Sequence, residues 1–510
     1  MSAPQTMSPD ALTDSRRPGL VLACVCACTI LVVGLVAAIN LAVPMLAASG
    51  LYPSSSELLW IVDAYVIVFA CLVIPAGAAG DRFGRKGVLI AGLVTFAAGA
   101  TISAASASVT SLLLGRAITG VGAALVLPNC VGVLVHATVP ERRARAIAIW
   151  GTMTGMGGLV GNIAGAALLT TGSWRILFAA IVPIALLCAL WTALAVQRSS
   201  RSPRSLDPAG TALLVAATIA LLIGIIEGPE RGWSSDIVIA AFAASVVLGA
   251  AWVVVELRVR HPLLDPRLFR IPLLSTVSLG MLVLFFGSFG LFYLNASLLQ
   301  YGRGYSVLQA GLAIVPMTVP MLLGAQFVPH LVKRIGIPAT LSAAFLAIGI
   351  GLFGLTTAVH HPYLAYASWL VLIGIGFALA LPCLTAELTA SLPAEQAGVA
   401  GGLQSATREL GSALGVAVVG TLLTESFTRH LPANLQHDES IPRTVAEAVA
   451  AAPAQQTAII DSFTAGAESA LRVASFVTII AGVLVVAVAF HASRRRSEQS
   501  STTMDSTASK

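Results

Sequence analysis

Charged residues are scarce in this chain. Only 10% of its 510 residues are Asp, Glu, Lys or Arg, only eight are histidine, and 57% are hydrophobic. A composition this poor in charge leaves little chain for a soluble domain. The 29 basic residues form no dense patch, which excludes a nucleic-acid-binding surface. All seven cysteines fall within apolar runs, so we expect neither a disulfide framework nor a metal site.

Catalytic and nucleotide-binding motifs are also missing. The sequence has no His-Glu-x-x-His and no Gly-x-Ser-x-Gly, and no histidine lies near the middle of an apolar run. These absences argue against a membrane-embedded enzyme, and we expect no cofactor. A Gly-x-x-x-x-Gly-Lys-Ser/Thr loop is absent as well, which excludes an ATP-driven pump.

Long apolar runs fill the sequence instead. Fourteen runs are long enough to cross a bilayer, because a hydrocarbon core about 30 Å thick needs roughly 20 residues of helix. Backbone that faces lipid must pair its own N–H and C=O groups, so we predict an all-α integral membrane protein. The predicted spans are 20–44, 58–79, 88–107, 110–135, 146–170, 176–196, 208–227, 235–256, 272–299, 307–330, 337–358, 363–388, 398–424 and 469–491.

Basic residues fall mostly on one side of these spans. Most of the 29 Lys and Arg residues lie in the tails or in the loops that share their side. Short loops rich in Lys and Arg stay in the cytoplasm. We therefore place both termini in the cytoplasm and the protein in the inner (plasma) membrane, and the net charge of +6 reflects this topology.

The spans group into two halves with an insertion. We predict an N-terminal six-helix half at 19–197, an inserted helix pair with its linkers at 198–270, and a C-terminal six-helix half at 271–492. The longest loop on the outer side covers 425–468 within the C-terminal half. The tails 1–18 and 493–510 are polar and rich in Ser and Thr, so we expect them to be disordered.

An internal repeat supports this division. Gly120-Val-Gly-Ala-Ala-Leu-Val-Leu-Pro128 returns as Gly374-Ile-Gly-Phe-Ala-Leu-Ala-Leu-Pro382. The loop 81–84, Asp-Arg-Phe-Gly, has a weaker echo at 333–336, Lys-Arg-Ile-Gly. Both echoes join spans of the same orientation, as in transporters whose halves are related by an axis along the membrane normal. This repeat favours alternating access over an open pore.

Several motifs together resemble those of one transporter family. The sequence Gly-Asp-Arg-Phe-Gly-Arg-Lys at 80–86 is similar to the signature between helices 2 and 3 of the major facilitator superfamily. The likeness to its fourteen-helix drug/proton antiporter family covers residues 20–490. The segments that carry it include Trp60-Ile-Val-Asp63, Leu114-Gly-Arg116, Ser173-Trp-Arg175, Glu227-Gly-Pro-Glu-Arg-Gly-Trp233 and Arg408-Glu409-Leu-Gly411.

The resemblance implies a major-facilitator fold that exports amphipathic drugs or antibiotics in exchange for protons. The implied partners are a small lipophilic substrate, protons and membrane lipids, with the protein a monomer. Leu35 stands where the family often has an acidic residue, and Asn162 stands where a proline is usual. A transporter of another cargo or direction, such as a solute/proton symporter or a lipid exporter, is the main alternative.

Charged residues inside spans are candidates for function, because a charge near the bilayer centre costs on the order of 3 kcal/mol. Asp63 and Arg116 lie about 9 Å from the outer ends of their spans, a depth at which they can pair. Pairing would let the position of Arg116 control the proton affinity of Asp63, as coupling requires. A static pair that only fixes helix packing is the alternative.

Other polar residues inside spans are weaker candidates. Glu409 matches a family position associated with substrate and proton sensing, but its neighbour Arg408 points about 100° away on the helix, so pairing is not assumed. Asn40, Asn129 and Asn162 would either line the cavity or bond neighbouring helices. We expect water to reach Glu227 at the end of its span.

The loop between the second and third spans has two interpretations. Its glycines permit a tight turn, its cations would lie at the anionic inner leaflet, and its aspartate can hold a partner helix by charge. In the family that it resembles, the loop is a latch that stabilises the outward-facing state. A simple topology anchor is the alternative. The residues concerned are Gly80, Asp81, Arg82, Gly84, Arg85 and Lys86.

Overall fold

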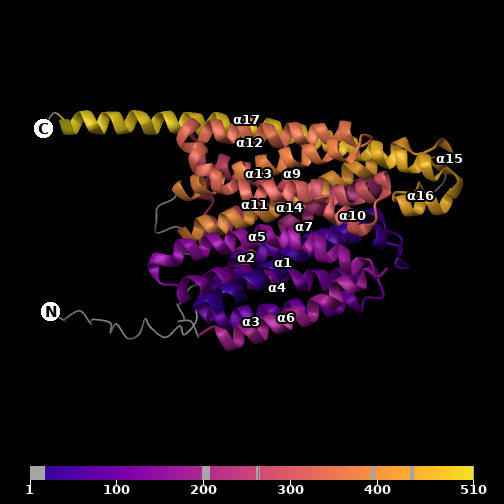
Figure 1. Ribbon diagram of the computed structural model, residues 1–510, viewed down its shortest axis with the longest axis horizontal. Helices are drawn as coiled ribbons and strands as arrows, with labels where there is room; N and C mark the ends of the chain where they lie inside the picture. Colours follow the sequence, from indigo (N-terminus) through magenta and orange to yellow (C-terminus); the bar gives the residue numbers. More distant parts are fainter. Residues whose placement is uncertain are drawn as a thin grey trace.

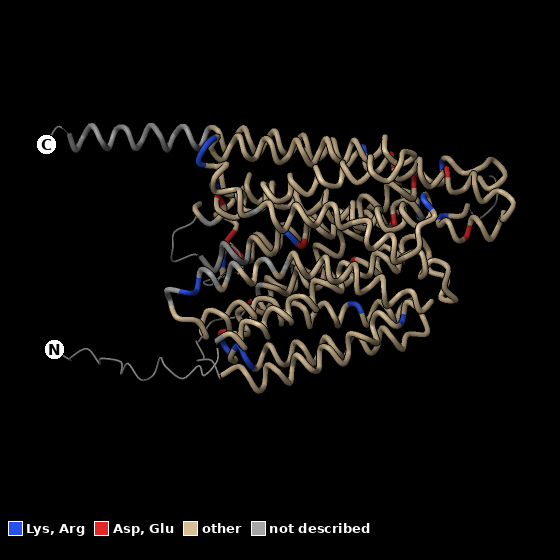
Figure 2. Tube along the Cα trace, in the orientation of Figure 1, with Lys and Arg blue, Asp and Glu red and all other residues tan. Residues whose placement is uncertain are grey.

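Long helices running side by side form the protein (Figure 1). The computed structural model describes residues 18–197, 207–259, 262, 265–391, 397–436 and 441–508. Fourteen helical segments among these residues are long and apolar enough to span a membrane, which confirms the predicted number. Figure 2 shows charged residues gathered near the two ends of the bundle, with few along its length. This distribution is expected if the middle of the bundle lies in hydrocarbon.

The first six spanning helices form an N-terminal set. They are α1 (Pro18–Ala47), α2 (Ser55–Phe83), α3 (Arg85–Ala104), α4 (Val109–Ala137), α5 (Pro140–Leu169) and α6 (Arg175–Ala195). Within the set, α4 packs on α1, α2 and α3, while α1 also packs on α5 and α6. A capping box starts α2, because Ser54 and Glu57 each accept a hydrogen bond from the other's backbone N–H.

The next two helices form a hairpin between the two sets. They are α7 (Pro208–Arg231) and α8 (Asp236–Arg258), and α8 packs mainly on α7. Gly232, at a φ of 87°, ends α7 in a backbone conformation that favours glycine. The other face of α7 lies against α2 of the N-terminal set and α14 (Ala397–His430) of the C-terminal set.

The remaining spanning helices form the C-terminal set. Besides α14, its helices are α9 (Pro272–Ser297), α10 (Val307–Leu312), α11 (Val315–Gly324), α12 (Val328–Ala358), α13 (Tyr363–Ala390) and α17 (Gln456–Ala508). Short elements join them: η2 (Pro266–Arg270), the π-helical η3 (Leu298–Gly302), η4 (Ala325–Phe327), α15 (Ala433–Gln436), α16 (Val445–Ala451) and η6 (Pro453–Gln455). The two sets meet where α2 packs on α14, α5 on α10 and α11, and α1 on α9.

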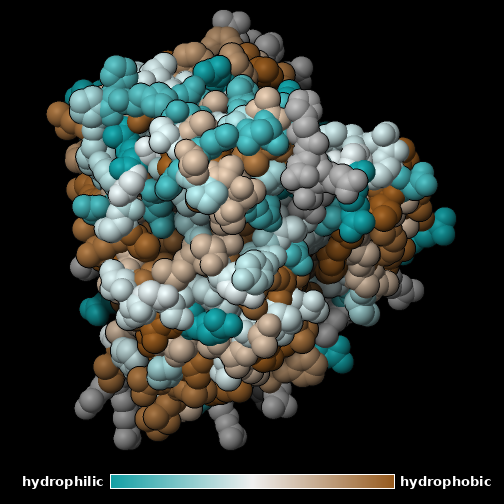
Figure 3. Space-filling view, turned by 90° about the vertical axis from the view of Figure 1, so that its right-hand side faces the viewer, coloured by the Kyte–Doolittle hydropathy of each residue, from teal (hydrophilic) through white to brown (hydrophobic). Residues whose placement is uncertain are grey.

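The two ends of the bundle differ. We call the end where α2 meets α3 the Gly84 end, and the end that carries α15 and α16 the α16 end. Figure 3 looks onto the α16 end, where hydrophilic residues spread over much of the face and hydrophobic ones gather toward its edges. This arrangement fits an end that faces water and a rim that faces lipid.

The internal repeat is present in the backbone and in the packing. Gly84 and Gly336 occupy equivalent positions and both have positive φ, at 103° and 81°. A side chain on Gly120 in α4 would meet the backbone of Tyr65 in α2, and one on Gly374 in α13 would meet the backbone of Met317 in α11. This contact of α4 with α2 therefore has a counterpart 252 to 254 residues later in the other set, as expected for repeats about an axis normal to the membrane.

The predicted tenth span, 307–330, is not one continuous helix. The structure divides it into α10, α11 and η4, with a break at Ala313 and Ile314. Pro316 lies four residues after the end of α10 and has no backbone N–H, so it cannot bond the carbonyl of Leu312, and its ring clashes with that carbonyl in a regular helix.

The long loop predicted on the outer side, 425–468, is shorter in the structure. Helix α14 continues to His430 and α17 already begins at Gln456. Ile459, Phe463 and Ala467 follow each other at helical spacing and are all buried, so the start of α17 is an amphipathic helix that packs on its neighbours. The Phe463 ring lies 5.5 Å from the ring of Tyr301, between centroids.

The C-terminal tail also differs from expectation. We predicted disorder at 493–510, but α17 continues as a helix to Ala508. No glycine or proline follows Gly482, so the sequence carries no strong signal to end the helix. The predicted N-terminal tail, 1–18, lies outside the described residues except for Pro18, the first residue of α1.

Candidate functional site

Asp63 is a buried carboxylate in the second spanning helix. Its side chain in α2 is 0% exposed, and neither of its oxygens has a hydrogen-bond partner. Leu59, one turn earlier on the same face, fills the space beside Gly420 of α14. Residues four apart on a helix share a face, so Asp63 lies on the side of α2 that approaches the C-terminal set.

Arg116 in α4 reaches the same turn of α2 but bonds its backbone. Its Nε donates to the carbonyl of Ile61 at 2.8 Å and its Nη2 to the carbonyl of Val62 at 3.1 Å. The guanidinium carbon also lies 4.8 Å from the centroid of the Tyr65 ring. Its third nitrogen, Nη1, has no hydrogen-bond partner. Arg116 is thus held beside Asp63 without a hydrogen bond to it.

Tyr65 of α2 connects helices of the N-terminal set near the contact with the C-terminal set. Its hydroxyl donates to the carbonyl of Val32 in α1 at 3.2 Å. The Arg116 guanidinium of α4 lies over the Tyr65 ring, and the paired Arg408 and Glu409 belong to α14, which packs on α2. Tyr293 of α9 lies beside Gly420 of α14, as Leu59 of α2 does. The candidate charges therefore occupy one region of the bundle, around α2 and its contact with the C-terminal set.

Arg408 and Glu409 form an ion pair although they are adjacent in sequence. The Nη2 of Arg408 lies 2.6 Å from Oε1 of Glu409, and Nε donates to the same oxygen. The guanidinium carbon lies 5.9 Å from the centroid of the Phe285 ring in α9. The arginine side chain is long enough to turn back along the helix, so the 100° offset between neighbours does not prevent pairing.

The three asparagines have different roles in the structure. Asn129 of α4 donates to the carbonyl of Ala76 in α2 at 3.2 Å, so it joins two helices. Asn40 and Asn162 donate to carbonyls of their own helices, those of Val36 and Gly158. Only Asn129 makes the interhelical bond that we considered for all three, while the Oδ1 of Asn40 has no hydrogen bond.

The loop at 80–86 holds the Gly84 end of the N-terminal set together. Asp81 pairs with Arg85 across the turn at 2.6 Å. The Nζ of Lys86 donates to the carbonyl of Ala193 in α6 at 2.8 Å, and the Arg82 guanidinium lies over the ring of Phe83. Gly84 supplies the turn with its positive φ, and its N–H donates to the carbonyl of Gly80.

Two contacts between this loop and α4 require a glycine, one at Gly80 in the loop and one at Gly132 in α4. The side chain of Asn129 fills the space where a Gly80 side chain would be, and that of Arg85 fills the space beside Gly132. Larger residues at Gly80 or Gly132 would push these side chains aside. The motif thus fixes α2 and α3 on α4, whatever further role it has.

Sequence reasoning missed one polar connection. Glu227 does not simply face water, since its side chain is only 15% exposed and accepts a hydrogen bond from Trp60. The two residues are 167 positions apart, so their contact leaves no local pattern. The available signal was indirect, because both lie in segments that resemble family motifs.

Comparisons with known proteins agree with this architecture. The family model described as Major Facilitator Superfamily matches residues 25–416. The chain is 31% identical to the tetracenomycin C resistance and export protein of Streptomyces glaucescens, over 73% of this chain and 70% of that protein. It is 30% identical to the multidrug efflux pump LfrA of Mycolicibacterium smegmatis, over 88% of this chain and 92% of that protein.

A solved structure shares the fold. A bacterial homologue of the human lysosomal transporter Spinster, in an inward-facing and unoccupied conformation, has a TM-score of 0.67 to this chain at 16% identity. The match covers 92% of this chain and 96% of that chain. The chain therefore has a known transporter fold, and it belongs to the major facilitator superfamily.

Proposed function

We propose that the protein exports small amphipathic drugs or antibiotics from the cytoplasm in exchange for protons. Relatives named as export and efflux proteins support the direction of transport. The observation that supports proton coupling is the buried Asp63 carboxylate, which has no hydrogen bond and lies where the two sets meet. An ionisable group in such a place inside a membrane is a functional candidate by default.

Asp63 would bind and release the coupled proton. Because neither oxygen is committed to a hydrogen bond, the carboxyl can exchange a proton without first breaking one. Arg116 would keep a positive charge at a fixed place beside it, since two backbone carbonyls hold the guanidinium. Glu409 and Arg408 would sense the substrate from the opposite set, on the helix that packs against α2.

Alternating access would move the two sets against each other. We treat 19–197 and 271–492 as the moving halves and 198–270 as the inserted pair. At the α16 end the sets are bonded, because Gln300 donates to the carbonyl of Leu41 and Tyr301 to that of Pro44. We infer that this conformation is closed at the α16 end, and that the Gly84 end faces the cytoplasm because its cations favour that side.

The loop at 80–86 would act as a latch in the outward-facing state. Its charged pair, Asp81 and Arg85, lies at the turn that joins α2 to α3, and α2 is one of the helices that contact the other set. Breaking this pair would therefore shift α2 and alter its contact with the other set.

Transport into vesicles tests the proposal. Purified protein is reconstituted, a pH gradient is imposed, and movement of a lipophilic antibiotic such as tetracenomycin C is followed together with internal pH. Antiport requires proton and drug to move in opposite directions. Movement in the same direction would support the solute/proton symporter, and drug movement insensitive to pH would contradict proton coupling.

A further inference from the structure

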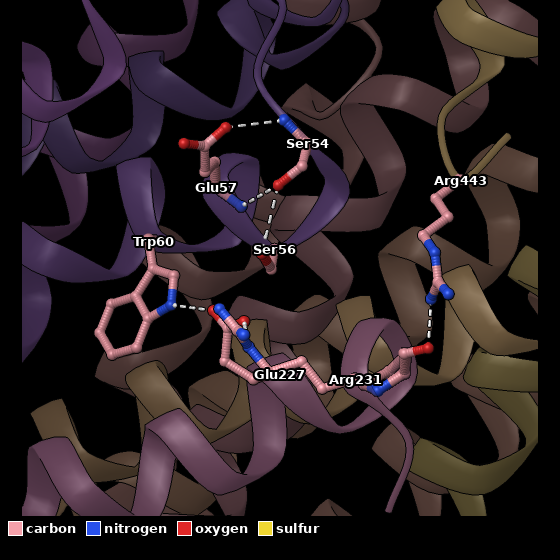
Figure 4. A network of polar contacts seen from close by, with 8 residues as sticks. Ser54, Ser56, Glu57, Trp60, Glu227, Arg231 and Arg443 are labelled. Atoms are coloured by element: carbon pink, nitrogen blue, oxygen red, sulfur yellow. Dashed lines mark hydrogen bonds and ion pairs between the residues drawn. The ribbon is translucent and has the colours of Figure 1, made fainter. Parts of the chain in front are cut away.

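The segment from Glu227 to Trp233 is not explained by the transport site. It ends α7, the first helix of the inserted hairpin, at the α16 end. Figure 4 shows its polar contacts. Trp60 of α2 donates from its indole nitrogen to one oxygen of Glu227 at 3.3 Å, and Arg231 donates to the other at 2.9 Å. The carboxylate thus accepts one hydrogen bond from within α7 and one from the N-terminal set.

The same turns of α7 also bond the C-terminal set. Thr421 of α14 donates from its hydroxyl to the carbonyl of Ile225 at 3.1 Å. Arg443, which precedes α16, donates to the carbonyl of Pro229 (Figure 4). The last two turns of α7 therefore hold α2 through a side chain and α14 through the backbone. We call the bonded residues Trp60, Ile225, Glu227 and Thr421 the α7 clasp.

The clasp lies beside the seam between the two sets. Next to Trp60, Leu59 packs into the space beside Gly420, the neighbour of Thr421. The two clasp bonds thus flank a direct contact of α2 with α14 at one level of the bundle. Asp63 follows Trp60 by three residues, so the two lie within one helical turn, about 5.4 Å, of each other along the axis of α2. A displacement of α2 at the clasp would also displace the proposed proton site.

We infer that the α7 clasp holds the N-terminal and C-terminal sets together at the α16 end, with Glu227 as the residue that positions α2. This inference rests on the proposed alternating access, in which that end opens and closes. When it opens, α2 and α14 move apart, so α7 must lose either its bond to α2 or its bonds to the C-terminal set. The inserted hairpin would then regulate opening rather than merely occupy lipid beside the two halves.

The bridge consists of two links in series, one from α7 to α2 and one from α7 to the C-terminal set, so the effects of breaking them should not add. If α7 bridges α2 and α14, breaking either link releases the bridge, so removing both does no more than removing one. If α7 is only anchored to the bundle, each bond contributes separately and the effects add. Trp60→Phe removes the link to α2. The link to the C-terminal set consists of the bonds from Thr421 and Arg443, so Thr421→Val and Arg443→Gln together remove it. Glu227→Gln removes the ion pair with Arg231 and weakens the link to α2.

The experiment measures opening of the α16 end directly. Leu41 is 1% exposed and lies against Gly311 of the other set, so a Leu41→Cys reporter is labelled only when the sets separate. All seven native cysteines are buried, and the protein without the reporter gives the background. A membrane-impermeant maleimide is applied from outside to cells that express each variant at matched membrane levels.

We expect Trp60→Phe, the double variant Thr421→Val/Arg443→Gln and the combination of all three substitutions to raise the labelling rate equally, by about fivefold to tenfold, as the loss of one or two net hydrogen bonds allows. Glu227→Gln should act in the same direction. The matched control is Glu425→Gln, which breaks an equivalent ion pair with Arg429 inside α14 alone and should leave labelling unchanged.

Unchanged labelling in the clasp variants, or additive effects in the combination, would overturn the clasp. These outcomes do not depend on drug transport. A clasp that fails this test leaves proton-driven export in vesicles intact, and a failure of the vesicle assay leaves the labelling result valid. The two proposals can therefore be rejected separately.

Discussion

Arg116 is bonded to the backbone next to Asp63 and not to Asp63 itself. Its two hydrogen bonds go to the carbonyls of Ile61 and Val62, while both Asp63 oxygens have no hydrogen bond. A static ion pair, our alternative for these residues, would have used the carboxylate. The arrangement keeps a cation beside a carboxyl whose oxygens make no hydrogen bond, as the proposed proton exchange requires.

Replacing Asp63 tests the coupling. Asp63→Asn keeps the size and the hydrogen-bonding capacity of the side chain but removes proton exchange, so we expect pH-driven uphill transport to be abolished. The protein should still insert, because no hydrogen bond of the structure depends on this carboxylate. Reconstituted vesicles measure transport, and detergent-solubilised yield measures insertion. Uphill transport at the normal rate in this variant would place coupling elsewhere, with Glu409 the next candidate.

Substitutions of Arg116 should lower the stability of the protein through lost hydrogen-bond geometry as well as lost charge. Arg116→Lys keeps the charge but cannot donate from two nitrogens in a fixed fork, so one of the two hydrogen bonds that join Arg116 to α2 is lost. We expect both Arg116→Lys and Arg116→Ala to destabilise the protein, the latter by roughly 2–3 kcal/mol. Thermal unfolding in detergent measures the change. A fully stable Arg116→Ala variant would show that these bonds do not hold α2 on α4.

A double variant of Asp63 and Arg116 tests whether the two side chains form an ion pair. If the arginine acts mainly on the α2 backbone, adding Asp63→Asn to Arg116→Ala should restore little of the lost stability. A buried ion pair would behave differently, because removing both partners is milder than removing one. Strong recovery in the double variant would therefore indicate direct pairing in the membrane.

The close contacts of the internal repeat can be compared in one pair of variants. A methyl group at Gly374 would meet the backbone of Met317, which cannot move without shifting α11, whereas Gly249 in α8 has open space around its Cα. We expect Gly374→Ala to cost about 1–3 kcal/mol through overpacking. Gly249→Ala should be neutral or stabilising, by up to about 1 kcal/mol, since alanine favours the helix. Equal unfolding temperatures would contradict the repeat contact.

Local patterns in the sequence were enough to predict the number of spans and the internal repeat. Apolar runs marked the helices, and the glycines of 120–128 and 374–382 marked two equivalent helix contacts. The partners of Arg116 could not be predicted, because backbone carbonyls occur at every position and leave no pattern. The bond between Trp60 and Glu227 joins distant segments and was missed for a similar reason. Pro316, by contrast, was a visible signal for the break after α10.

Asp81 carries the last prediction, which separates a latch from a topology anchor. The structure gives it a partner in its own loop, Arg85 at 2.6 Å. If this pair only stiffens the turn, Asp81→Asn and Arg85→Gln should have the same effect, a loss of about 1 kcal/mol or less. A latch that stabilises the outward-facing state requires the carboxylate itself. Asp81→Asn should then slow net efflux and lower external labelling of Leu41→Cys, with little change in substrate affinity from the cytoplasmic side, because the proposed site lies deep in the bundle. Equal labelling in Asp81→Asn, Arg85→Gln and the parent, with normal transport, would leave the loop as an anchor.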